Sequence, residues 1–245
     1  MKRKGKYAIN VCLPIFFLIY WFIYNYRYIK PENSLTAEEK IIIINSDSKG
    51  FFCYIIVSTF FTIIYLLYIN FLLNKLQDFE IIRSGKIVFF KKQLNIICIQ
   101  TLIYTASFEL INVLMNYFCL PATLLHESKF IILSAIHFFL LYIYFLLVGA
   151  LFILMNTIVS FKSISVWITA FVFCGLLGLS KLFHIEGLPI KDFCVFDSWY
   201  NGVLNISPII ISIIKNVITI CICFLLAKNI FLTKDILANK SIKLN

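Results

Sequence analysis

Two ionisable residues interrupt the apolar stretches of the sequence, and they are the side chains most able to carry chemistry there. Glu109 and Lys215 each lie deep in a run that is long enough to cross a bilayer. A charge in lipid costs at least about 2.5–3.5 kcal/mol on insertion scales, so such residues pair or line a wet cavity. Asn112 and Asn116 continue the helical face of Glu109, and Asn216 adjoins Lys215. We predict that Glu109 and Lys215 pair among these amides, either as a structural contact or as part of a binding or gating site.

A histidine completes this predicted intramembrane polar cluster. We expect His137 to form a hydrogen bond with a neighbouring helix, and a catalytic role is the alternative. The adjacent acids Glu38 and Glu39 are of the kind used by some membrane proteases. However, Thr36 lies three residues before Glu39, which indicates a helix-capping box instead.

The chain contains no motif of a known catalytic centre. It has no H-E-x-x-H pair, no G-x-S-x-G turn and no G-x-x-x-x-G-K-[ST] phosphate loop. Its eight cysteines have no metal-ligand spacing, although Cys119 and Cys194 lie near one predicted membrane face and could form a disulfide or stay free. We therefore expect no enzyme, no metal and no cofactor in this chain.

Composition indicates the class of protein that must hold these residues in place. Hydrophobic residues make up 61% of the 245 residues and charged residues only 14%, which is too little polar surface for a water-soluble domain. The sequence is typical of an integral membrane protein in the lipid bilayer of the cell (plasma) membrane. Its abundance of Ile, Phe, Lys, Asn and Tyr fits AT-rich codons and so favours a bacterial source.

The apolar stretches predict an all-α polytopic protein with six transmembrane helices. Runs of this length suit helices, whereas a barrel shows short alternating segments. No linker divides the chain, so we expect a single membrane domain over residues 1–245. The predicted helices are 7–26, 51–73, 94–119, 130–159, 164–183 and 206–232.

The distribution of Lys and Arg predicts the orientation of these helices. If both termini are cytoplasmic, the inner segments carry about twice as many basic residues as the outer segments, as the positive-inside rule requires. The net charge of +10 then reflects topology and contact with anionic lipid. Because the basic residues are dispersed among loops, we expect no nucleic-acid partner.

The segment 74–93, "NKLQDFEIIRSGKIVFFKKQ", is a charged and amphipathic loop on the predicted inner face. Asn74 could cap a short helix, and Gly85 could end it in a left-handed conformation. The apolar face of that helix would consist of Leu76, Phe79 and Ile82. This segment is either a positive loop lying in the headgroups or a docking element for a cytoplasmic partner.

The order of two helices, this inner loop with "IIRSGK" and "KK", and four more helices resembles the permease subunits of ABC-2-type exporters. It is most similar to small, divergent permeases of bacterial peptide or bacteriocin export and self-resistance systems. The resemblance covers nearly the whole chain as an architecture, but only about ten residues as a motif. In this family the loop between helices two and three docks on the ATPase.

The resemblance implies a permease that moves a peptide or another amphipathic substrate. It also implies two partners, a separate ATP-binding subunit and a second permease copy or a paralogue. The docking residues that it implies are Leu76, Phe79, Ile82, Arg83, Gly85 and Lys86. The alternative is a non-transporting membrane protein, such as an immunity factor or the partner of a sensor.

Overall fold

The computed structural model describes residues 4–30, 34–74, 79–159, 161–183 and 188–234, and within these ranges every regular element is a helix. This confirms the predicted all-α class. The long helices are α1 (Lys4–Ile29), α4 (Thr62–Asn74), α6 (Lys86–Cys119), α8 (Phe130–Ile158), α9 (Lys162–Phe183) and α11 (Ile206–Thr233). The short elements are α2 (Ala37–Asn45), α3 (Tyr54–Ile56), the π-helical turn η1 (Val57–Phe61), α5 (Phe79–Ser84), α7 (Ala122–Glu127), the 3-10 turn η2 (Pro189–Lys191) and α10 (Phe196–Tyr200).

Among the described residues, five segments are long and apolar enough to cross a membrane. They are Tyr54–Leu73, Lys86–Cys119, Phe130–Ile158, Lys162–Phe183 and Ile206–Thr233. Each corresponds to one of the predicted helices. The remaining prediction, 7–26, lies within α1, whose 26 residues are long enough but end in a segment rich in tyrosine that also contains Arg27.

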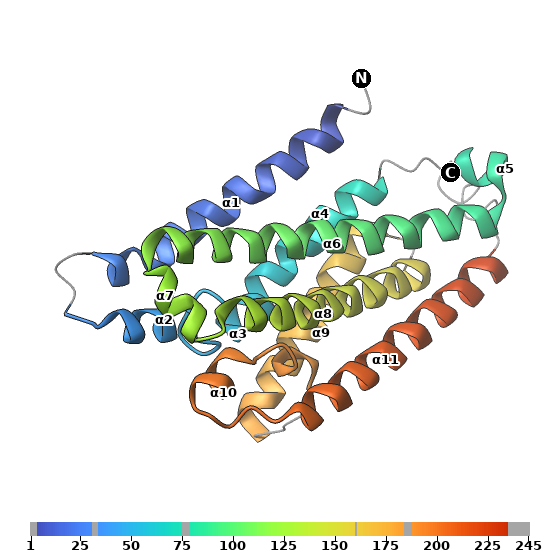
Figure 1. Ribbon diagram of the computed structural model, residues 1–245. Coiled ribbons are helices and arrows are strands. Elements are labelled where there is room, and N and C mark those ends of the chain that lie inside the picture. The colour runs from blue at the N-terminus through green and yellow to red at the C-terminus, as the bar shows by residue number, and fades with distance from the viewer. Residues whose placement is uncertain (1–3, 31–33, 75–78, 160, 184–187, 235–245) are drawn as a thin grey trace.

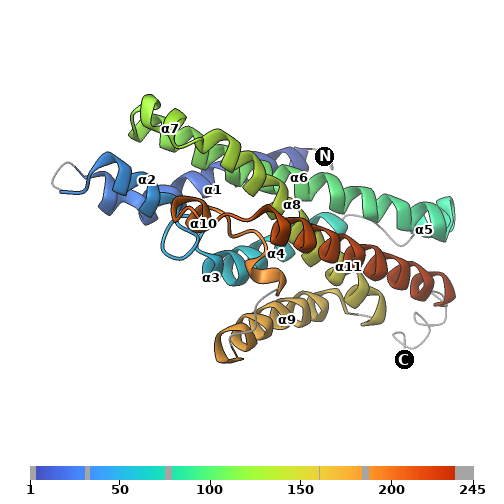
Figure 2. The same cartoon turned by 60° about the horizontal axis from the view of Figure 1, so that its bottom comes forward.

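Helix α8 is the centre of the bundle. It contacts α4, α6, α7, α9 and α11, and its residues Tyr144, Phe145 and Val148 have no exposed surface. In Figures 1 and 2, α6, α8 and α11 run lengthwise along the molecule, and α9 crosses on another side of α8. The start of α1 and the end of α11 both point toward the end of the molecule at which α5 lies.

We call this the α5 end, and we call the opposite end, which carries α2 and α7, the α2 end (Figure 1). Helix α2 begins with the predicted capping box, because Thr36 Oγ1 accepts from Glu39 N at 3.2 Å and Glu39 Oε2 accepts from Thr36 N at 2.8 Å. The adjacent acids Glu38 and Glu39 therefore have a structural explanation at the beginning of this helix.

Helices in lipid associate through close packing and hydrogen bonds, because lipid and side chains are equally apolar. Both are present around α8. Gly149 lets α8 approach α4 and α6 so closely that an added Cβ would lie 2.7 Å from Tyr65 Oη and 2.8 Å from Ile97 Cγ2. The Tyr65 hydroxyl also shares a hydrogen bond of 2.6 Å with Thr101 Oγ1 on α6.

The π-helical turn η1 contributes a hydrogen bond of a different kind. A π-turn interrupts the regular backbone hydrogen bonds of a helix and tends to free a carbonyl. The Phe61 carbonyl, at the end of η1, accepts a hydrogen bond of 3.0 Å from the buried Tyr104 hydroxyl of α6. The hydroxyl of Thr62, the next residue, forms a hydrogen bond of 2.9 Å with the hydroxyl of Tyr144 on α8. The irregular turn therefore joins three helices.

The segment 74–93 differs from its prediction in two respects. Asn74 is the last residue of α4 and not the cap of the next helix, and residues 86–93 are the first turns of α6 and not a loop. Gly85 does end α5, with φ 79° and ψ 155°, a conformation that is open to glycine but not to residues with a Cβ. Leu76 lies outside the described residues.

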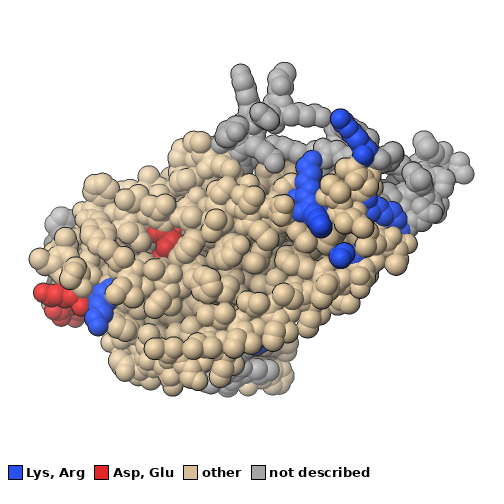
Figure 3. Space-filling view, turned by 45° about the vertical axis from the view of Figure 1, so that its right-hand side comes forward, with Lys and Arg blue, Asp and Glu red and all other residues tan. Residues whose placement is uncertain are grey.

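Charged side chains lie at the two ends of the molecule. On the face drawn in Figure 3, most Lys and Arg side chains lie toward the α5 end, acidic side chains lie toward the other end beside a basic one, and the surface between is uncharged apart from one recessed acidic group. An uncharged middle between charged ends is what a bilayer requires of a protein that crosses it.

All eight cysteines are free, so Cys119 and Cys194 do not form a disulfide.

We expect Gly149→Ala to destabilise the protein by about 1–3 kcal/mol, because the new methyl group overlaps Tyr65 and Ile97. The matched control is Gly178→Ala on α9, where a Cβ would meet no described atom within 4 Å. Thermal unfolding of the purified protein in detergent should show a lower Tm for the first variant and an unchanged Tm for the second. Equal Tm values would contradict the close packing of α8.

Candidate functional site

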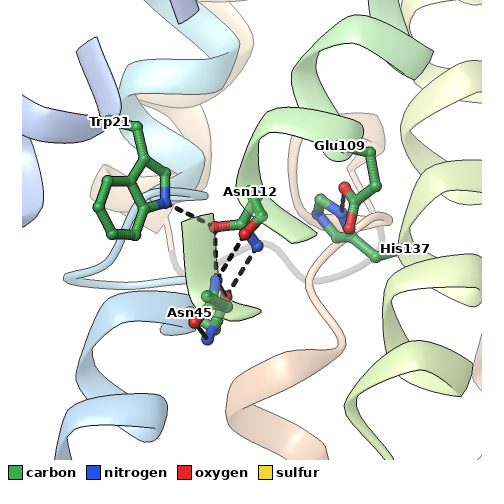
Figure 4. A network of polar contacts seen from close by, with 6 residues as sticks. Trp21, Asn45, Glu109, Asn112 and His137 are labelled. Carbon is green, nitrogen blue, oxygen red and sulfur yellow. Dashed lines mark hydrogen bonds and ion pairs between the residues drawn. The ribbon is translucent and has the colours of Figure 1, made fainter. Parts of the chain in front are cut away.

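The predicted intramembrane polar cluster divides into separate groups. Glu109 on α6 meets His137 on α8, with 2.9 Å between Glu109 Oε2 and His137 Nδ1 (Figure 4). Lys215 on α11 instead forms an ion pair of 2.7 Å with Asp192 Oδ2, in the loop after η2. The structure thus gives Glu109 and Lys215 different partners, and the predicted pair between them is wrong. The predicted hydrogen bond from His137 to a neighbouring helix is confirmed.

The Glu109–His137 pair lies in aromatic surroundings. The His137 ring has no exposed surface, and its centroid is 4.0 Å from that of Phe52 and 5.3 Å from that of Phe196. Glu109 is 5% exposed. Aromatic contacts from the 46–53 loop and α10 therefore hold the imidazole in place while the carboxylate approaches from α6.

Asn112 and Asn116 belong to a second group, an asparagine network that includes residues the sequence did not suggest. Trp21 Nε1 donates to Asn112 Oδ1 at 3.0 Å, and Asn112 Nδ2 donates to Asn45 Oδ1 at 2.8 Å. Asn45 Nδ2 in turn donates to Asn116 Oδ1 at 3.0 Å. Figure 4 shows this network beside the Glu109–His137 pair. All four side chains are buried, so the network fixes α1 and α2 against α6.

Asn216 belongs to a third group around Asp192. Asp192 Oδ2 accepts a hydrogen bond of 2.8 Å from Asn216 Nδ2, and Asp192 Oδ1 accepts one of 2.8 Å from Ser212 Oγ. Together with the Lys215 ion pair, these bonds attach the loop after η2 to one face of α11. The group is structural in character, because each Asp192 oxygen already has a partner.

Two aspartates join the 46–53 loop to α10 by reciprocal hydrogen bonds. Asp47 N donates to Asp197 Oδ1 at 3.2 Å, and Asp197 N donates to Asp47 Oδ2 at 2.9 Å. Burial raises the pKa of the Asp47 carboxyl from 3.8 to about 7, and the nearby Asp197 carboxylate also raises it. His137 and the Asp197 backbone N–H act in the opposite direction, but burial dominates.

A groove of about 320 Å³ opens between α6 and α8 beside the Glu109–His137 pair. Its walls are mostly apolar, and Leu110 and Ile131 on its rim are 56% and 57% exposed. Glu109 and Ser134 are the two polar residues that line it. This size is at the low end of the range for small-molecule sites.

Among the described residues, no group of His, Cys, Asp and Glu could hold a metal ion.

The predicted docking residues have different roles in the structure. Arg83 is exposed on α5, as a docking residue must be. Lys86 is engaged elsewhere, because its Nζ donates to the carbonyls of Leu232 and Lys234 at 3.1 and 2.9 Å. It therefore caps the end of α11, where free carbonyls favour a cation. The side chains of Phe79 and Ile82 lie outside the described part of the chain.

Comparison of the chain with protein-family models, with curated proteins and with solved structures finds no match. The function must therefore be argued from the chain itself.

The raised pKa of Asp47 predicts the direction of a pH effect on stability. Between pH 4 and pH 7 the folded carboxyl binds a proton that the unfolded carboxyl has lost, so the free energy of unfolding falls as pH rises. Each unit of pKa shift corresponds to about 1.4 kcal/mol, so the effect is of the order of a few kcal/mol. Thermal unfolding should give a higher Tm at pH 5 than at pH 8.

Asp47→Asn keeps an oxygen that accepts from Asp197 N but cannot ionise, so it should flatten this pH dependence. Glu127→Gln, at an exposed carboxyl on α7, should leave the pH dependence unchanged. An Asp47→Asn protein that still loses stability between pH 5 and pH 8 as the parent does would show that another group is responsible.

Proposed function

We propose that this chain is the permease subunit of an ATP-driven exporter of the ABC-2 type, located in the plasma membrane of a bacterium. It has six spans, with α1 as the first, and both termini are cytoplasmic. Its substrate is a peptide or another amphipathic molecule. The chain has no phosphate-loop motif, so ATP hydrolysis occurs on a separate subunit.

The observation that carries this proposal is the construction of the α5 end. Helix α6 has 34 residues and so is about 51 Å long, whereas the hydrocarbon core of a bilayer is about 30 Å thick. Its basic first turns, with Lys91 and Lys92 exposed, therefore suit a position beyond the lipid. The short helix α5 precedes them after the break at Gly85, and Arg83 is exposed on it. A soluble ATP-binding subunit could reach this arrangement.

The interior of the bundle supports a partnership with a second permease copy or paralogue. Tyr65, Tyr104 and Phe145 are fully buried at its centre, and their ring centroids lie 5.0 to 5.3 Å apart. Aromatic side chains therefore fill the space that a route through one bundle would need. In this proposal the substrate passes along the outside of the bundle or between two bundles.

A second candidate function is that of a non-transporting immunity factor or sensor partner. The groove between α6 and α8 favours it, because exposed apolar residues on the groove's rim suit a molecule that stays in the lipid. Such a protein needs no ATP-binding subunit. Association with an ATPase is therefore the property that separates the two candidates.

Co-expression with a candidate ATP-binding subunit, taken from any such gene found next to this one, should give a complex that co-purifies. Arg83→Glu should reduce the co-purified ATPase about tenfold, because it places a repelling charge at a cation of the interface. The matched control is Lys228→Glu, which makes the same change of charge at an exposed lysine near the end of α11. A complex that both variants retain equally would rule out docking through α5, and failure of the parent chain to capture any ATPase would favour the second candidate.

Topology can be tested by cysteine labelling in a background in which the eight native cysteines are replaced. With a membrane-impermeant maleimide, Asn201→Cys should react in intact cells, because residue 201 is exposed at the predicted outer face. Ser84→Cys on α5 should react only after the membrane is opened. Labelling of position 84 in intact cells would reverse the orientation and exclude a cytoplasmic ATPase at α5.

A further inference from the structure

The groove between α6 and α8 combines apolar walls with polar atoms that have no partner. Glu109 uses Oε2 to bind His137, but its Oε1 is buried and accepts no hydrogen bond in the described structure. The same is true of Ser134 Oγ, and Ser134 is only 2% exposed. A buried polar atom without a partner destabilises the fold, so a ligand that supplies the missing hydrogen bond gains binding energy.

These two atoms belong to one small constellation. Ser134 lies three residues before His137, so both project from the same face of α8, and His137 binds Glu109 from α6. Both Glu109 and Ser134 line the groove. Close approach of α6 and α8 thus brings the side chains that carry these two oxygens to the wall of one groove.

The chemistry of the recess selects the head group of a ligand. A carboxylate oxygen only accepts hydrogen bonds, and a hydroxyl oxygen has two acceptor lone pairs. A primary ammonium group offers three N–H donors from a single atom and the charge opposite to that of a carboxylate. A carboxylate or phosphate head group would instead meet Glu109 with like charge.

The walls select the rest of the ligand. Val113 and Phe138, together with the exposed rim residues Leu110 and Ile131, form an apolar surface that faces away from the bundle centre. Glu109 lies ten residues before the end of α6, about 15 Å along the helix. A ligand must therefore carry its cationic group into the apolar zone on an apolar body.

We propose that this groove is a binding site for an apolar molecule with one primary ammonium group, which donates to Glu109 Oε1 and Ser134 Oγ. Such a group can be the amine of an amphipathic peptide or of a membrane-soluble alkylamine. The inference goes beyond the proposed function, because binding here requires neither an ATPase nor transport. It assigns a role to the two polar groups of this groove that have no hydrogen-bond partner in the described structure.

The test uses the full chain in nanodiscs of phosphatidylcholine, a lipid without a primary amine. The probe is dodecylamine with a diazirine on its alkyl chain, and the corresponding alcohol and carboxylic acid serve as matched probes. After irradiation, mass spectrometry should find the amine probe attached within residues 106–113 and 131–138. Labelling there by the alcohol and the acid should be at least tenfold weaker. Equal labelling by all three probes would overturn the proposal, since it would show hydrophobic partition only.

Three variants locate the contact. Glu109→Gln should reduce labelling by the amine at least tenfold, because it removes the negative charge that strengthens the hydrogen bond from the ammonium group. Ser134→Ala should reduce it less, and it removes a hydroxyl that contributes no hydrogen bond to the fold. Ala135→Phe should block the groove with an exposed side chain that leaves the core unchanged, whereas Thr219→Phe on the exposed face of α11 should have no effect.

These variants keep the proposal testable if Glu109→Gln folds poorly. Labelling that persists in both Ser134→Ala and Ala135→Phe would place the bound amine elsewhere. A peptide source and an alkylamine source can be separated by competition, in which an apolar peptide with a free amine either displaces the probe or does not. If neither that peptide nor unlabelled dodecylamine competes, the groove is not an amine site.

Discussion

A polar side chain inside a lipid-bound bundle has no water to bind, and the arrangement of this protein depends on how each one finds a partner on another element. The Tyr104 hydroxyl donates to the Phe61 carbonyl at the end of η1, and Trp21 donates to Asn112 across the α1–α6 contact. Because hydrophobicity does not distinguish helix from lipid, such directional contacts decide which helix lies beside which. Apolar residues then fill the space that the hydrogen bonds define. The Glu109–His137 pair is among the exceptions to this pattern, since each residue keeps one polar atom without a partner in the described structure.

The sequence predicts the candidate membrane-spanning helices well, because the length of a continuous apolar run must match the thickness of the hydrocarbon core of the bilayer. The structure places α8, α9 and α11 within two residues of the predicted ends. The start of α6 is eight residues earlier than predicted, at Lys86. Hydropathy reports where lipid ends, and a helix can continue into water when its residues have adequate helix propensity, as Lys91, Lys92 and Gln93 do. Gly85, with its positive φ, marks the true start of this helix.

The partners of the polar residues could be predicted only in part. Depth along the helices placed Glu109 and Lys215 at the same level, but depth says nothing about which faces are adjacent. Lys215 forms an ion pair with Asp192 in a loop, and Asn112 forms a hydrogen bond with Asn45 at the end of a short helix. Loop residues have no periodicity that would locate them, so a single sequence gives no signal for either contact. The position of His137 in an apolar run predicted a hydrogen bond to another helix. It did not predict that Glu109 would be the partner.

The hydrogen bonds from Lys86 to the end of α11 can form only after α11 has been synthesised, so the α5 end reaches its final structure late. The ribosome makes Lys86 nearly 150 residues before the carbonyl of Leu232 that it binds, and Lys234 in turn reaches back to the Thr157 carbonyl at the end of α8. Until α11 has entered the membrane, both connections are missing and one side of α8 faces lipid. The position of α5 is therefore completed only when α11 has been made. A chain that ended before α11 would present α5 without this support, so any protein that recognised the geometry of α5 would distinguish chains with α11 from chains without it.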